Sequence, residues 1–60
     1  MKEQLERQID AVRRRIVRLA DEAAQHRALG RDALADKLEQ EQKKAEIEAS
    51  HLEHFLSSAA

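Results

Sequence analysis

Apolar residues and one histidine recur at alternating spacings of four and three along the first half of the chain. These positions are Leu5, Ile9, Val12, Ile16, Leu19, Ala23 and His26. Such heptad spacing aligns the side chains on one stripe of a helix and is typical of a helix that packs along a coiled-coil seam. Continuing the spacing would place Gly30, Lys37 and Lys44 in the seam, so the register must change near residue 30.

A second seam without charged residues fits the rest of the chain: Ala35, Leu38, Gln42, Ala45, Ala49, Leu52, Leu56 and Ala59. The phase jump between the seams is not one that a continuous coiled coil absorbs, and a turn explains it better. Gly30 can adopt the left-handed conformation that ends a helix, and Asp32 can cap the next one. We expect an all-α helical hairpin forming a single unit, with helices over about 3–29 and 32–57 and a turn at 30–31. The alternative is a bent or continuous helix of about 85 Å.

The two seams pair in a consistent way if the chain folds back at the turn. Facing residues in an antiparallel pair then have numbers that add up to 61, as for Ile9 with Leu52 and Val12 with Ala49. Large residues face alanine in the middle layers, which lets helices approach closely. The flanks are expected to form ion pairs of Arg13 with Glu46, Arg15 with Glu48 and Arg27 with Asp32.

Length and composition exclude several classes of protein. A chain of 60 residues with one glycine and no proline, rich in helix-forming residues, is neither a sheet protein nor an enzyme with its own pocket of about 300 Å³. We therefore expect no catalytic residues and no cofactor. The sequence has no cysteine, so disulfides and thiolate metal sites are absent.

Charge and hydropathy bound the partners and the compartment. The formal net charge is −1, which gives little overall attraction to nucleic acid or to an acidic membrane. No uncharged stretch approaches the roughly 20 apolar residues of a membrane span, and the first residues do not form a signal peptide. We expect a cytoplasmic protein.

A two-helix hairpin buries too little apolar surface to be stable alone. Apolar residues are also left outside the seams: Val17, Ala20 and Ala24 on one flank of the first helix, and Leu34, Ile47 and Phe55 on the flank or back of the second. A second copy completing a four-helix bundle would cover them most simply, and another protein's helix is the other option. The sequence thus predicts a non-catalytic protein–protein interaction module, a small dimeric regulator, adaptor or chaperone-like subunit.

A basic cluster gives an alternative function. Arg13, Arg14, Arg15 and Arg18 lie close together in the sequence, and Arg14, Arg15 and Arg18 would contact the phosphates of RNA or another nucleic acid. Three consecutive residues span about 200° of a helix, however, so they cannot all face one ligand. No aromatic residue on the first helix is available to stack on bases.

Polar residues near the end of the second helix have metal-ligand spacing. Glu48, His51 and His54 contain the Glu-x-x-His and His-x-x-His patterns of helix-bundle metal sites. The first seam offers no inward-facing glutamate, so we expect no metal there. Gln42 and His26 are polar seam residues, and such residues usually fix register or oligomeric state.

The length, the layering of large residues against alanine and the turn at Gly30 resemble the general plan of small helical-hairpin regulators. The plasmid RNA-binding protein Rop and the hairpin co-chaperones of type III secretion share that plan. The resemblance covers the whole chain and rests on no motif, so it assigns no functional residue.

Overall fold

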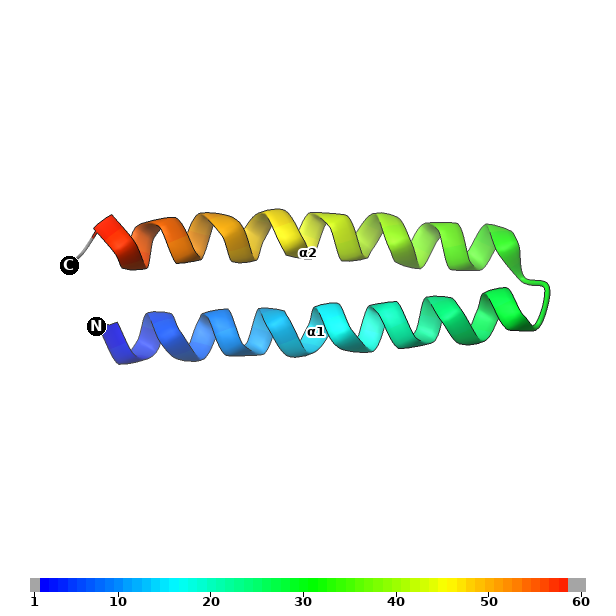
Figure 1. Cartoon of the computed structure of the whole chain (residues 1–60), viewed down its shortest axis with the longest axis horizontal. Helices are drawn as coiled ribbons and strands as arrows, with labels where there is room; N and C mark the ends of the chain where they lie inside the picture. Colours follow the sequence, from blue (N-terminus) through cyan, green and yellow to red (C-terminus); the bar gives the residue numbers. More distant parts are fainter. Residues whose placement is uncertain (1, 59–60) are drawn as a thin grey trace.

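The computed structural model describes residues 2–58 and consists of two helices, α1 (Lys2–Ala28) and α2 (Asp32–Ser58). They run antiparallel, side by side, so that the start of α1 and the end of α2 lie at the same end of the molecule (Figure 1). The molecule measures 46 × 14 × 10 Å. The predicted hairpin is confirmed, and the alternative of a continuous helix is wrong. The helix ends differ from the expected bounds by at most one residue.

The turn is built around Gly30, whose φ of 77° is the left-handed conformation. The Arg31 N–H donates to the carbonyl of His26 at 2.8 Å, and the Gly30 N–H donates to the carbonyl of Arg27 at 3.0 Å. This pair of bonds is the Schellman motif, which satisfies carbonyls that the end of α1 would otherwise leave free. The glycine therefore ends α1 and reverses the chain direction.

The start of α2 differs in detail from the prediction that Asp32 caps it. The Ala35 N–H donates to the carbonyl of Arg31 at 3.0 Å, which makes Arg31 the capping position and Asp32 the first helical residue. The register of the turn causes the shift, since the Schellman motif already ends at Arg31. Asp32 still favours the helix, because its negative charge lies near the positive end of the helix dipole.

The core consists of residues from the two predicted seams. The buried residues are Ile9, Val12, Leu19 and Ala23 of α1 and Ala35, Ala45 and Ala49 of α2. Val12 packs with Ala45 and Ala49, and Ile16 and Leu52 pack against this cluster. The other seam residues within 2–58 are half-buried, whereas Ala59 lies outside the described residues.

Ion pairs flank the core, with two of the three expected ones present. Arg15 Nη2 lies 2.6 Å from Glu48 Oε2, and Arg27 Nη1 lies 3.7 Å from Asp32 Oδ1. The prediction that Arg13 pairs with Glu46 is wrong, because Arg13 Nη2 instead lies 2.6 Å from Glu53 Oε1.

The tilt of helical side chains explains the partner of Arg13. Side chains lean toward the N-terminus of their own helix. In this antiparallel pair, two residues therefore lean toward each other when their numbers add up to more than 61, and apart when the total is smaller. Arg13 and Glu53 converge, whereas Arg13 and Glu46 diverge. The long pair of Arg27 with Asp32 follows the same rule.

Candidate interaction surfaces

Among residues 2–58, five large apolar side chains are exposed on the hairpin. The exposed fractions are 61% for Val17, 66% for Leu29, 43% for Leu34, 57% for Ile47 and 67% for Phe55. These side chains do not form one patch. Leu29 and Leu34 flank the turn, and the other three lie on different sides of the two helices.

The predicted partner-binding residues divide between separate surfaces. Val17 and Ala24 are exposed and Ala20 is half-buried, so these three form a strip along one flank of α1. Ile47 lies between the buried residues Ala45 and Ala49, on the side of α2 that faces away from the core. Phe55 is eight residues further on, which separates it from Ile47 by about 12 Å along the helix and about 80° around it. Ile47 and Phe55 therefore do not belong to one strip.

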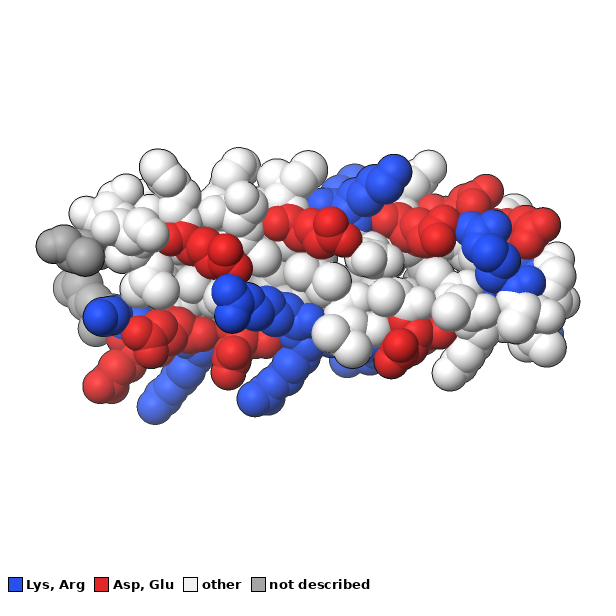
Figure 2. All heavy atoms as spheres, viewed as in Figure 1, with Lys and Arg blue, Asp and Glu red and all other residues white. Residues whose placement is uncertain are grey.

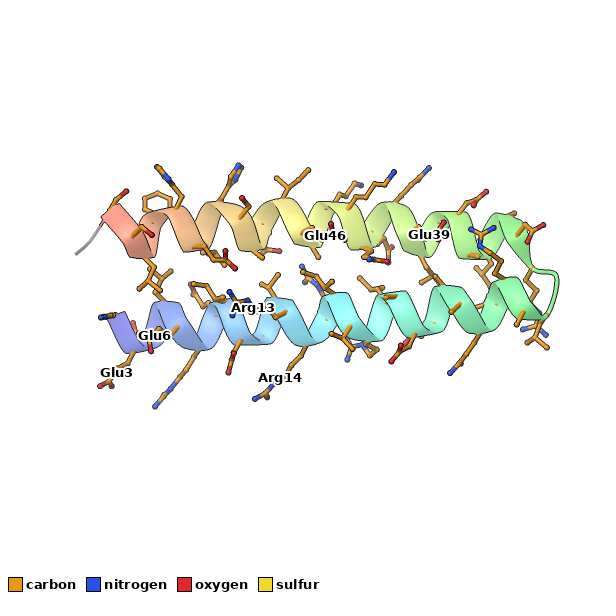
Figure 3. All side chains as sticks on the ribbon, in the orientation of Figure 1. Glu3, Glu6, Arg13, Arg14, Glu39 and Glu46 are labelled. Carbon is orange, nitrogen blue, oxygen red and sulfur yellow. The ribbon has the colours of Figure 1, made fainter. Side chains whose placement is uncertain are left out.

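The arginine cluster is divided in the same way. Arg13 turns to one side of the hairpin to reach Glu53, and Arg15 turns to the other to reach Glu48. Arg14 points away from α2 (Figure 3) and lies 3.8 Å from Asp10 through Nη2 and Oδ2. Within residues 2–58, Arg18 forms no ion pair.

Arg15 and Arg18 border an open groove between the helices, with a volume of about 420 Å³. Leu19 and Ala45 are its buried apolar lining residues, and the charged ones are Arg15, Arg18, Glu41, Lys44 and Glu48. We call this side of the hairpin the groove face. Three cations and two carboxylates line the groove, so it has no strong charge of one sign.

The candidate metal ligands do not converge. Glu48 is engaged by Arg15, and His51 and His54 are exposed. In the part of the chain that the structure describes, no group of three or more His, Asp or Glu side chains is placed to hold a metal ion.

The two polar seam residues differ in how their polar atoms are satisfied. Gln42 is half-buried, and its Nε2 donates to Oε1 of Glu46 at 3.0 Å. Glu46 is thereby held beside its own helix. His26 is also half-buried, but its Nδ1 is buried without a hydrogen-bond partner among residues 2–58. Of the two polar seam residues, His26 is therefore the one with an unsatisfied hydrogen-bonding atom.

The face opposite the groove is acidic, and Figure 2 shows it. We define this acidic face by the charged flank residues on that side: Glu3, Glu6, Asp10, Arg13 and Arg27 of α1 and Asp32, Asp36, Glu39, Lys43, Glu46 and Glu53 of α2. Eight carboxylates against three cations give these residues a net charge of −5, and Arg14, at the border of the face, lies 3.8 Å from Asp10. Carboxylates follow one another along α2, and uncharged surface lies beside them on the middle of α1 (Figure 2).

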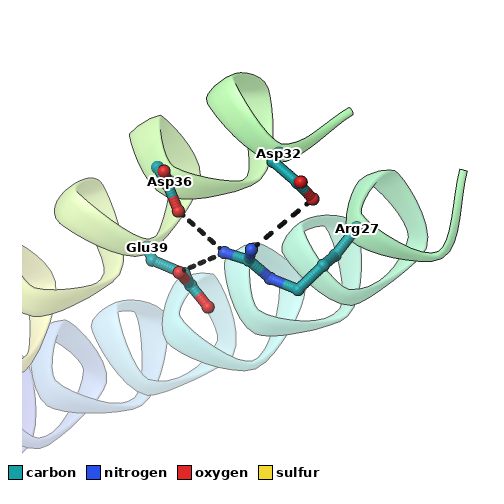
Figure 4. Close-up of polar contacts among 4 residues, drawn as sticks. All are labelled: Arg27, Asp32, Asp36 and Glu39. Carbon is teal, nitrogen blue, oxygen red and sulfur yellow. Dashed lines mark hydrogen bonds and ion pairs between the residues drawn. The ribbon is translucent and has the colours of Figure 1, made fainter. Parts of the chain in front are cut away.

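At the end of the acidic face nearest the turn, the guanidinium of Arg27 contacts three carboxylates (Figure 4). Arg27 Nη2 lies 2.9 Å from Asp36 Oδ1 and 2.7 Å from Glu39 Oε1, in addition to the contact with Asp32. The hydrogen bond to Asp36 and the charge of Glu39 raise the pKa of Arg27 above its ordinary value. Sequence reasoning missed Asp36 and Glu39, although the tilt rule, applied to Arg27, points to both.

No protein-family model matches the chain, and neither a curated protein nor a solved structure matches it. Neither helix, as far as residues 2–58 go, is long and apolar enough to cross a membrane.

Proposed function

We propose that this chain is a non-catalytic protein–protein interaction module, a small regulator, adaptor or chaperone-like subunit that pairs with a second copy into a four-helix bundle. The observation that carries the proposal is the exposure of five large apolar side chains, each between 43% and 67% exposed. These side chains do not form one patch, but packing against a partner would remove their apolar area from water, which favours association.

The small core supports the same proposal. Four of the seven buried residues are alanines, which remove little apolar area from water: Ala23, Ala35, Ala45 and Ala49. The ion pairs around the core contribute about 0–1 kcal/mol each, because their side chains are exposed. A hairpin of this kind gains stability by packing helices against a partner, in the manner of an amphipathic helix laid into a groove.

Nucleic-acid binding is the alternative, and the geometry favours it less. Arg14 and Arg15 each have a carboxylate partner and point to different sides of α1, which leaves Arg18 without an adjacent free arginine. Phosphate binding would weaken steeply between about 50 and about 200 mM salt, whereas apolar packing would hardly respond.

Sedimentation equilibrium with circular dichroism on the same sample tests the proposal. We expect a helical species of twice the 6.9 kDa monomer mass. Replacing Val17, Ile47 or Phe55 by glutamine, one at a time, identifies the side chains that the second copy covers. Gln40→Ala, at an exposed polar position of α2, is the control that leaves the mass unchanged.

Two other outcomes are informative. A monomer with little helix would mean that another protein, rather than a second copy, supplies the partner surface. A stable and fully helical monomer, unaffected by the three glutamine substitutions, would contradict the proposal, because the hairpin would then need no partner.

A further inference from the structure

The acidic face combines an apolar strip with a surplus of negative charge. Val17, Ala20 and Ala24 lie on the flank of α1 that borders this face, with Val17 61% exposed. Glu39 and Glu46 of α2 lie on the same face, at about the level of the strip (Figure 3). Apolar side chains and carboxylates are thus presented together to one partner.

The cations of this face do not neutralise its carboxylates. Arg13 is occupied by Glu53, and Arg27 is shared among three carboxylates near the turn. Glu46 accepts a hydrogen bond from Gln42, a neutral donor, and forms no ion pair within residues 2–58. Toward the other end of the face, Glu3 and Glu6 are likewise in no ion pair among the described residues. Asp10 lies 3.8 Å from Arg14, so Glu3, Glu6 and Glu46 are the carboxylates of this face that remain for a partner to meet.

We infer that the acidic face binds a basic amphipathic helix of another protein. This inference rests on the proposed function as an interaction module and names the chemistry of the partner. The apolar stripe of the incoming helix packs on Val17, Ala20 and Ala24, and lysines or arginines beside that stripe reach Glu39 and Glu46.

The size of the strip fits a helix. Val17 and Ala24 are seven residues apart, two turns or about 10 Å of α1. Partner residues at spacings of three and four would cover that length. The two alanines let a helix approach closely, since interaxial distances fall to about 8 Å where the contact residues are small.

The negative charge of the acidic face disfavours two other binding partners. A second copy presenting its own acidic face would bring two surfaces of −5 together, and like charges across an interface are unfavourable. A nucleic acid would be repelled for the same reason. A helix with cations beside an apolar stripe meets both features of the face.

The test uses the full chain and a synthetic helical peptide with leucines at i, i+3, i+4 and i+7 flanked by lysines. A matched peptide carries glutamates in place of the lysines. By titration calorimetry, we expect the lysine peptide to bind and the glutamate peptide not to bind. Binding should weaken severalfold between about 50 and about 300 mM salt, because the charges are exposed.

Paired variants of the protein locate the site. Val17→Gln should weaken binding of the lysine peptide about fivefold or more, because a partly buried valine is lost from the interface. Gln40→Ala, at an exposed polar position of α2 outside the proposed binding surfaces, should leave binding unchanged. Glu46→Gln should weaken binding, whereas Glu41→Gln, on the groove face, should not.

Equal binding of the two peptides, or equal effects within each pair of variants, would overturn the inference. So would a loss of self-association in Val17→Gln without peptide, because the strip would then be covered by a second copy. The mass of the chain is measured without any peptide, so the proposed function is tested separately. A chain that self-associates but binds neither peptide refutes this inference alone.

Discussion

Replacing Gly30 by alanine tests the physical basis of the hairpin. Gly30 has a φ of 77°, and a Cβ atom added there would meet nothing within 4 Å. The substitution therefore causes no collision, and its cost is the conformational energy of placing an L-residue in the left-handed region, about 1–2 kcal/mol. Alanine also restricts the unfolded chain, which offsets part of that cost.

The magnitude is measurable by thermal unfolding followed by circular dichroism. A loss of about 1 kcal/mol lowers the midpoint of a domain near this size by roughly 4–8 °C. Gly30→Asn should lose less, because asparagine adopts the left-handed conformation more readily than alanine. Arg31→Ala is the adjacent control, since Arg31 has a negative φ and its bonds in the turn come from the backbone.

The protein concentration is held fixed across the series, because self-association would shift the midpoints. A Gly30→Ala variant as stable as the parent, with the same mass in sedimentation, would refute the reasoning. It would mean that the left-handed glycine and the Schellman bonds do not limit the stability of the turn.

Three further predictions concern the core and its flanks. Ala35→Leu should lower the stability by about 1–3 kcal/mol, measured by urea unfolding, because Ala35 is 0% exposed and a larger side chain there would push the two helices apart. His26→Leu should raise the stability by about 1 kcal/mol in the same assay, since it removes a buried nitrogen without a partner, and a loss would contradict this view. Glu53→Gln should lower the stability by up to about 1 kcal/mol through its pair with Arg13, whereas Glu46→Gln should change it less; equal losses would count against the tilt rule.

The heptad seams made the fold predictable from the sequence. Every seam residue within 2–58 is buried or half-buried, and only Ala20 and Glu22 join them from outside the seams. The left-handed conformation of Gly30 could be predicted from the sequence equally well, because few other residues adopt it. These features depend on spacing along one chain, which the sequence displays directly.

The surfaces were less predictable, because they depend on how flanks of different helices meet. Val17 and Ala24 were expected to be exposed and are, whereas Ile47 and Phe55 turn out to face different directions. The acidic face was not recognised as a unit, since its carboxylates are spread from Glu3 to Glu53 in the sequence. Folding at the turn gathers them on one side.

The tilt of side chains toward the N-terminus of their own helix determines which ion pairs form between the helices. Matching the residues that lie directly opposite each other does not predict these pairs correctly. All cross-helix pairs with N–O distances below 3 Å join residues whose numbers add up to more than 61, and the pair below that total, Arg27 with Asp32, is the longest at 3.7 Å. By the same rule, Glu46 diverges from Arg13 and forms no ion pair with it. A carboxylate that diverges from the nearest arginine of its own hairpin is thereby free for a cation of another protein, which links the internal geometry of the pair to the charge of the proposed partner.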